Sequence, residues 1–345
     1  MDAGIQSHPN SEMLAQIGNG AYGTVYRARS ASGQIVAVKK VRVNLSADGI
    51  LLSTLRKVLL LKELTQCEHL NIVKLLDVCT GNRTETDLYL FLVLEHLEQD
   101  LSNYIEKCPQ SGMGASLVRD IMFQTLMSGV DFLHSKRVIH RDLKPQNILI
   151  SSSGTVKLAD FGLAKTYDFE MLLTSVVVTI WYRAPEVLLN STYATPVDTW
   201  SCGCIMGELF LLRPIFYGTS EVDQLDKIFS ILGIPPETSW PEQTTLPWSL
   251  FKNYTAADLE GMMPDCSPDG LNLLQNLLMF DPCQRISAAK ALAHPYFKEH
   301  GYIACYLNCI FTRILRRKRN VHKYFELTKD CNKINSVAHS ITLHY

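Results

Sequence analysis

Two carboxylates, an amide and a lysine occur within one short stretch near the middle of the chain. Asp142, Lys144 and Asn147 are close neighbours, and Asp160 follows after a short gap. Transfer of a phosphoryl group needs an acceptor for the substrate hydroxyl's proton, a cation near the γ-phosphate and oxygen ligands for Mg²⁺. We therefore predict Asp142 as the base and Lys144 as the cation. Asn147 and Asp160 are the predicted metal ligands.

Short apolar runs flank these polar residues. Val138-Ile139 precede them, Ile148 to Ile150 follow Asn147, and residues 156–159 come directly before Asp160. Runs of this length and composition are typical of short buried strands. Ser152-Ser153-Gly154 has the composition of a tight turn, which would join the last two strands as a hairpin. The sequence therefore predicts a loop of polar side chains held between strands.

A glycine-rich segment near the N-terminus is a second candidate site. Gly18, Gly20 and Gly23 form the pattern G-x-G-x-x-G, and Val25 follows two residues later. The pattern alone is ambiguous because dinucleotide-binding folds share it. Those folds open a helix at the glycines, whereas here a strand-like run continues to Arg29. We expect two strands joined by a turn whose N–H groups can approach phosphates closely.

Composition favours a globular protein with a sizeable core. The chain is 47% hydrophobic and 19% charged, and its net charge of -1 gives no overall attraction to nucleic acid or to a membrane surface. Residues 1–13 lack the apolar core of a signal peptide, and no run of about 18 apolar residues would span a bilayer. The ten cysteines show no paired framework. Cys202-Gly203-Cys204 lies in an apolar run, which favours core thiols over a metal site.

The order of these motifs resembles that of protein kinases. Lys39 ends the run V-A-V-K, His140 begins H-R-D, Asp160 begins D-F-G, and Ala184-Pro185-Glu186 follows. Longer stretches are similar to cyclin-dependent kinases, and most of all to the subgroup partnered by D-type cyclins. These stretches are Gly20–Gly23, Leu52–Arg56, Glu95–Asp100, Leu173–Arg183 and Tyr193–Asp198.

The resemblance implies an α+β, two-lobed protein-kinase fold. A small antiparallel β-sheet lobe with one helix would occupy about residues 11–95, and a larger, mainly helical lobe about 98–297. Residues 1–10 would be a disordered lead. Residues 298–345 form a divergent apolar and basic tail, which fits either a nuclear-localisation or acidic-surface role, or an irregular packed or disordered segment.

The resemblance also implies ATP and Mg²⁺ as cofactors, and serine or threonine followed by proline as the site of phosphorylation. Lys39 would pair with the α- and β-phosphates, the backbone near Glu95 and Leu97 would bind adenine, and Leu94 would control access to the pocket behind it. The residues implied to bind ATP are Ile17, Gly18, Gly20, Gly23, Val25, Ala37, Lys39, Glu95, Leu97 and Leu149.

Two regulatory phosphorylation sites are also implied. Thr174 lies in the expected activation segment, where plain loop polarity is the alternative interpretation. A phosphate there needs cationic partners, and the candidates are Arg56, Arg141 and Lys165. Tyr22 matches a position where phosphate inhibits family members by repelling ATP.

An amphipathic helix is expected over residues 51–65. It resembles the family's cyclin-binding helix, so we expect a cyclin, D-type by the resemblance, as activating partner. Inhibitor proteins of the kinase are further expected partners, and the family implies residence in nucleus and cytoplasm. Asp100 and Asn103 begin the following helix, where they either cap it or touch the ribose.

Two positions depart from the family pattern. Lys57 stands where the family has a glutamate that pairs with the strand lysine, and two lysines repel each other. Glu63 lies on another face of the same helix and is a poor substitute. Lys165 stands where an arginine is expected, which preserves the charge.

Two hypotheses follow. The first is an active cyclin-dependent serine/threonine kinase that acts in the G1 phase of the cell cycle. The second, supported by Lys57, is a catalytically impaired kinase-fold scaffold that binds cyclin or inhibitor proteins. A small-molecule kinase is disfavoured by the long activation segment and by Ala184-Pro185-Glu186.

Overall fold

The computed structural model describes residues 11–20, 23–46, 49–50, 52–84, 86–161, 165–166, 179–242, 244, 246–252 and 254–300. The chain divides into two compact units, Met1–Leu292 and Ala293–Tyr345. The 3-10 helix η5 (Pro295–His300) belongs to the second unit, and every other element named below belongs to the first. Among the described residues, no helix is long and apolar enough to cross a membrane.

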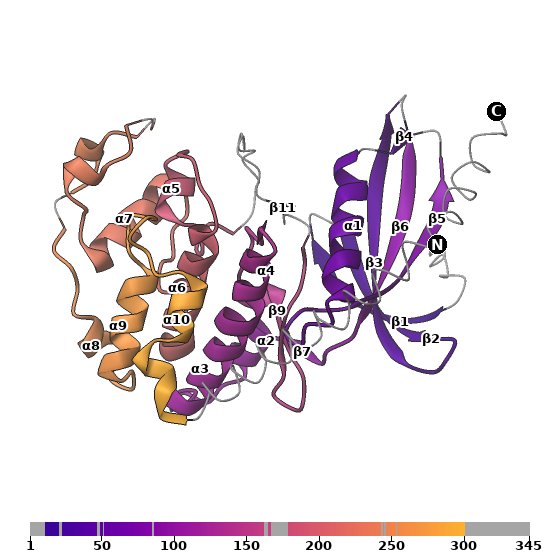
Figure 1. Cartoon of the computed structure of the whole chain (residues 1–345), viewed down its shortest axis with the longest axis horizontal. Coiled ribbons are helices and arrows are strands. Elements are labelled where there is room, and N and C mark those ends of the chain that lie inside the picture. Colours follow the sequence, from indigo (N-terminus) through magenta and orange to yellow (C-terminus); the bar gives the residue numbers. More distant parts are fainter. Residues whose placement is uncertain are drawn as a thin grey trace, which may run out of the picture. The chain divides into compact units, whose positions relative to one another are not determined.

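An antiparallel sheet forms the N-terminal part of the first unit (Figure 1). Its strands run in the order β1-β2-β3-β6-β5, and the short β4 pairs with β3. The strands are β1 (Ser11–Gly20), β2 (Gly23–Ser30), β3 (Ile35–Ser46), β4 (Gly49–Ile50), β5 (Leu75–Arg83) and β6 (Asp87–Glu95). Because β3 is hydrogen-bonded to both β2 and β6, its residues are fixed on two sides.

Side chains alternate between the two faces of this sheet, and each face holds a buried cluster. Val43, Leu88 and Leu90 form one cluster, and Val58 of the helix α1 (Leu52–Gln66) packs against it. The other cluster consists of Ala28, Val36, Val38, Phe91 and Val93. The expected sheet lobe with one helix is therefore present, and α1 lies within one residue of the helix predicted at 51–65.

The remainder of the first unit is mainly helical (Figure 1). Its α-helices are α2 (Leu101–Glu106), α3 (Ala115–Met122), α4 (Asp131–Ser135), α5 (Pro185–Leu188), α6 (Pro196–Leu211), α7 (Glu221–Leu232), α8 (Leu259–Met262), α9 (Pro268–Leu277) and α10 (Ala288–Leu292). A π-helix, η1 (Phe123–Val130), joins α3 to α4, and the 3-10 helices are η2 (Pro145–Asn147), η3 (Glu237–Ser239) and η4 (Trp248–Leu250). The expected two-lobed α+β class is confirmed.

Two small sheets lie beside these helices. The first has the order β10-β9-β7, and the second pairs β11 with β8. Their strands are β7 (Gln99–Asp100), β8 (Val138–Ile139), β9 (Ile148–Ile150), β10 (Val156–Leu158) and β11 (Lys165–Thr166). The predicted antiparallel hairpin of β9 and β10 is confirmed. Asp100 caps α2, because its carboxylate accepts a hydrogen bond from the N–H of Asn103 at 2.8 Å.

The sequence of residues 116–135 predicts a long helix, and the structure has three successive helical elements there, α3, η1 and α4. The π-helical part was not expected. Gly129 lies in it, and a Cβ added there would come within 2.6 Å of the side chain of Leu158 in β10. The widened turns thus occur where β10 packs against the helix, a tertiary contact that local periodicity does not encode.

The apolar run after Asp198 forms the central helix α6. Cys202 and Cys204 are buried in it, and burial raises the pKa of both thiols well above the ordinary value. A Cβ on Gly203 would lie 2.7 Å from Leu278, so this glycine permits close packing beside the end of α9. The interpretation of Cys202-Gly203-Cys204 as core residues is confirmed.

A buried ion pair anchors the residues that follow the activation segment. Arg285 donates to both carboxylate oxygens of Glu186, at 2.8 and 2.9 Å. Its remaining donors are used by the carbonyls of Pro196, Met279 and Phe280. A buried pair with all donors satisfied fixes geometry, because removing one partner leaves an uncompensated charge. From the sequence, Glu186 is a candidate partner of Arg285 that would anchor the activation segment, and this pairing is confirmed.

Close by, the Tyr182 hydroxyl donates a 2.6 Å hydrogen bond to the carboxylate of Glu208 on α6. Both side chains are buried. Burial raises the pKa of Glu208 to about 7, although the hydrogen bond from Tyr182 acts in the opposite direction.

The raised pKa of Glu208 predicts that the stability of the fold depends on pH. Its pKa is higher in the folded state than the ordinary value of 4.5, so its contribution is fully present below pH 4.5 and is lost as the pH rises through about 7. Between pH 4.5 and 8 the chain should lose about 2–3 kcal/mol of unfolding free energy that Glu208→Gln does not lose. Urea unfolding at both pH values measures this difference. Equal pH dependence of the two proteins would contradict the assignment.

Candidate active site

The polar loop after β8 is held by a buried carboxylate at the start of α6. Asp198 accepts hydrogen bonds from the N–H groups of His140 and Arg141 and from Nε2 of His134, each at 2.9 Å. Burial alone would raise the pKa of Asp198, but the hydrogen bond and charge of His134 hold it below its ordinary value. These contacts fix Arg141 in the left-handed region, with φ of 70°.

His140 connects this loop to the segment that carries Asp160. Its Nε2–H donates to the carbonyl of Ala159 at 2.9 Å. Its Nδ1 is therefore the acceptor, and it receives the N–H of Asp142 at 3.4 Å. The ring also lies 5.1 Å from the ring of Phe161. One buried side chain thus sets the spacing between the two predicted carboxylates.

The structure brings the predicted base, the predicted cation and one predicted metal ligand together. Lys144 Nζ donates to both carboxylate oxygens of Asp142, at 3.2 and 3.0 Å. The side-chain amide of Asn147 donates to the Asp142 carbonyl at 2.7 Å and to its carboxylate at 3.0 Å. The carboxylate of Asp142 is therefore oriented by a cation and an amide before any substrate binds.

Asn147 and Asp160 fit the donor set that Mg²⁺ prefers. The amide nitrogen of Asn147 is used by Asp142, and the described residues supply no donor to its Oδ1. Carboxylate and amide oxygens are suitable Mg²⁺ ligands. Within the described ranges, no group of three or more His, Cys, Asp or Glu residues gathers as a metal site. Asn147 and Asp160 therefore suit an Mg²⁺ ion that is held by one or two protein oxygens together with phosphates.

Lys39 and Asp160 form an ion pair across the site. Lys39 Nζ lies 2.6 Å from Asp160 Oδ1, and both side chains are largely shielded from solvent. Asp160 has a φ of 55°, in the left-handed region. The predicted phosphate-binding lysine and the predicted metal ligand are therefore direct neighbours.

The two strands expected on either side of the glycine segment are present as β1 and β2. Gly18 pairs with Val25 and Gly20 with Gly23 in the β1–β2 register. Gly23 has a φ of 129°, and a Cβ there would overlap the carbonyl oxygen of Lys40. Only glycine allows this close approach of β2 to β3.

The other residues expected at the ATP site come from three parts of the structure. Ile17 belongs to β1, Leu149 belongs to β9, and Leu97 follows β6. In the sheet register, Val25 lies opposite Lys39, and Ala37 lies opposite Leu94. Glu95 ends β6, and its carboxylate is engaged by Lys157 at 2.7 and 2.9 Å.

Of the predicted phosphate-binding cluster of Arg56, Arg141 and Lys165, the structure describes only the side chain of Arg141. The guanidinium of Arg141 lies 5.5 Å from the centre of the Tyr193 ring. Arg56 is in α1 and Lys165 is in β11, opposite Ile139, but their side chains lie outside the described residues. Thr174 and Tyr22 lie outside the described residues altogether, as does the side chain of Lys57. Glu63 is exposed.

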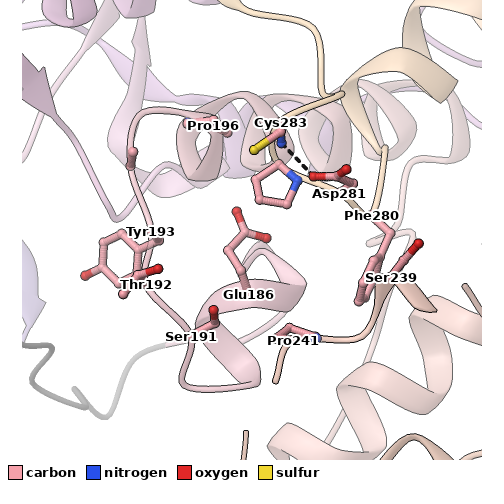
Figure 2. A pocket seen from close by; sticks show the side chains of 12 residues that line it. Glu186, Ser191, Thr192, Tyr193, Pro196, Ser239, Pro241, Phe280, Asp281 and Cys283 are labelled. Atoms are coloured by element: carbon pink, nitrogen blue, oxygen red, sulfur yellow. Dashed lines mark hydrogen bonds between the residues drawn. The ribbon is translucent and has the colours of Figure 1, made fainter. Parts of the chain in front are cut away.

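A separate pocket of about 430 Å³ lies beside the α5–α6 connection (Figure 2). Tyr193, Glu186, Phe280 and Cys283 are among its lining residues, and Asp281 accepts a hydrogen bond from the N–H of Cys283 at 2.8 Å. Its lining includes none of the predicted catalytic, ATP-binding or metal-binding residues. The pocket is therefore distinct from the candidate active site.

Sequence reasoning missed Asp198 and His134, which fix the loop from outside the motif. In the sequence, Asp198 stands out only as the last residue of a stretch similar to cyclin-dependent kinases. The sequence does contain a signal for Asp198. A carboxylate at the start of an otherwise apolar helix is expected to be buried, and a buried carboxylate needs several hydrogen-bond donors.

Comparison with known proteins agrees with this geometry. A sequence model described as the protein kinase domain matches residues 11–297. The chain is 52% identical over 289 residues to Cyclin-dependent kinase 4 of Rattus norvegicus, which covers 83% of this chain and 95% of the relative. It is 52% identical over 304 residues to Cyclin-dependent kinase 4 of Xenopus laevis, which covers 88% and 95%.

We predict that Asp142→Asn lowers phosphate transfer by about 100-fold or more, because it removes the proton acceptor while preserving shape. Nucleotide affinity should change less than about threefold, since the carboxylate is not expected to hold the nucleotide. Transfer from labelled ATP and titration with a fluorescent ADP analogue measure the two effects. Asp269→Asn, at an exposed position of α9, is the matched control. Retained turnover would remove Asp142 from this role.

We also predict that Lys57→Glu raises turnover by about 10- to 100-fold in the presence of a D-type cyclin. The substitution supplies an orienting partner for Lys39, and misplacement of reacting groups costs rate on this scale. Lys62→Glu, at an exposed position of the same helix, is the control for added negative charge. A Lys57→Glu variant no faster than the unmodified chain would show that Lys57 does not impair it.

Proposed function

Because this chain belongs to the protein kinase family, its phosphate donor is ATP, and we propose that it is a cyclin-dependent serine/threonine kinase. The carboxylate of Asp142, held by Lys144 and Asn147, is the observation that carries the proposal. The similarity to Cyclin-dependent kinase 4 from rat and frog supports the cyclin-dependent class and a role in the cell cycle.

The residues of the site divide the reaction between them. The oxygen of the substrate hydroxyl attacks the γ-phosphorus, and the bond from this phosphorus to the bridging oxygen of ADP breaks. Asp142 accepts the hydroxyl proton. Lys144, 3.0 Å from Asp142, neutralises charge on the transferred group, and Lys39 holds the α- and β-phosphates.

Asn147 and Asp160 would hold Mg²⁺. When bound there, Mg²⁺ would supply positive charge that offsets the negative charge of the phosphates. The contact of Asp160 with Lys39 supports this proposal, because the proposed metal ligand and the proposed phosphate-binding lysine are direct neighbours.

The proposed activating partner is a D-type cyclin. The helix α1 resembles the family's cyclin-binding helix, and Leu59 on it is 64% exposed, so an apolar side chain is available for a partner to cover. The proposal extends to serine or threonine followed by proline as substrate, to a role in G1, to inhibitor proteins as further partners, and to residence in nucleus and cytoplasm.

A scaffold without catalysis is the second candidate, and Lys57 is the observation that favours it. The complete set of base, cation and oxygen ligands favours the enzyme. The two candidates differ in turnover, not in cyclin binding.

The test is transfer of labelled phosphate from ATP to a protein with a Ser-Pro site, with and without a D-type cyclin and with Thr174 phosphorylated. We expect cyclin to raise the rate by about tenfold or more, the scale of a coupling between two sites. A Ser-Ala substrate is the matched control and should be phosphorylated poorly. Cyclin binding without turnover would replace the enzyme with the scaffold.

A further inference from the structure

An ion pair joins the end of β6 to the middle of β10. Lys157 Nζ donates to both carboxylate oxygens of Glu95, at 2.7 and 2.9 Å. The side chain of Lys157 is 12% exposed and that of Glu95 is 22% exposed. Glu95 is the last residue of the N-terminal sheet, whereas β10 pairs with strands beside the helices. The contact therefore connects the two lobes.

The same carboxylate is tied to the segment after α1. Glu95 Oε1 accepts the N–H of Lys74 at 2.7 Å, and the N–H of Glu95 donates to the carbonyl of Lys74 at 3.0 Å. In this segment, the carbonyl of Asn71 accepts the N–H of Leu158, and its side-chain amide donates to the carbonyl of Val156 at 2.7 Å. Glu95 therefore closes a ring of contacts that runs through β10.

The strand β10 connects the Glu95–Lys157 ion pair to the expected nucleotide site. Lys157 pairs in register with Leu149, which is expected to contact the nucleotide. Val156 and Leu158 are buried, and Lys157 lies between them on the other face of the strand. Asp160 follows β10 and receives Lys39 at 2.6 Å. Two ion pairs thus cross between the lobes, one beside the expected adenine position and one beside the expected phosphates.

We propose that Glu95 and Lys157 are positioning residues for ATP. Their ion pair holds the adenine-binding backbone from Glu95 to Leu97 at a fixed spacing from Leu149 and Asp160. The carboxylate acts through this backbone, because its oxygens are used by Lys74 and Lys157. The inference rests on the proposed function, since it concerns the nucleotide site of the kinase.

The burial of the pair explains why its loss should move the backbone. Without Lys157, the carboxylate of Glu95 keeps only the N–H of Lys74 in a largely enclosed place. A poorly paired, buried charge is costly, so the end of β6 would shift toward solvent. The bidentate pair of Arg42 and Asp87 has similar distances, 2.8 and 2.8 Å, but both residues belong to the N-terminal sheet. It therefore provides a control for the loss of a bidentate ion pair that does not cross between the lobes, with the cation of this pair 63% exposed.

The test uses the full chain and a fluorescent ADP analogue, titrated without metal. Lys157→Met removes the charge at nearly constant length, and Lys157→Arg keeps a cation with paired donors. We expect the analogue to bind about 5- to 10-fold more weakly to Lys157→Met, and within about twofold of the unmodified affinity to Lys157→Arg and Arg42→Met. In assays of transfer, KM for ATP should rise more than kcat falls for Lys157→Met.

Three results would overturn the inference. They are unchanged or tighter binding by Lys157→Met, equal weakening in Arg42→Met, and failure of Lys157→Arg to preserve affinity. If Lys157→Met does not fold, Glu95→Gln replaces it, because the amide keeps an acceptor for Lys74 and weakens only the charge attraction. Failure of the unmodified chain to bind the analogue would overturn the proposed function as well, so the two failures are distinguishable.

Discussion

The carboxylate of Asp198 is the contact on which the geometry of the candidate site depends most. It is completely buried and accepts three hydrogen bonds, two of them from consecutive N–H groups of the loop at His140 and Arg141. A buried charge that loses a donor is penalised by its desolvation. A shift of the loop backbone would therefore cost the desolvation energy of Asp198. As a result, Asp142 is held at a fixed position relative to α6.

The site itself is built from lysine–carboxylate pairs that exist before a nucleotide binds. Asp142 is paired with Lys144, Asp160 with Lys39 and Glu95 with Lys157, at shortest distances of 3.0, 2.6 and 2.7 Å. The first lies within the loop, and the other two cross between the lobes. In the proposed function Lys39 holds the phosphates, which would then compete with Asp160 for it and couple nucleotide binding to the position of Asp160.

This arrangement bears on the unusual Lys57. The family pattern assigns the orientation of Lys39 to a glutamate on the helix after β3, and the chain has lysine there. The structure gives Lys39 a carboxylate partner that comes from outside α1. The orientation of Lys39 therefore does not depend entirely on the helix, which is compatible with an enzyme that tolerates Lys57.

The sequence by itself determined the strands around the polar loop, the hairpin of β9 and β10, the two strands on either side of the glycine segment and the identity of the polar residues. These features follow from alternation, turn composition and spacing, which are local. The tertiary structure alone decided that Asp198 anchors the loop, that residues 123–130 form π-helical turns, and that the carboxylate of Glu95 is used by Lys157. Each of these features depends on groups that lie far apart in the chain. The packing of whole helices and strands brings such groups together, and neither segment carries a periodic pattern that would indicate the contact.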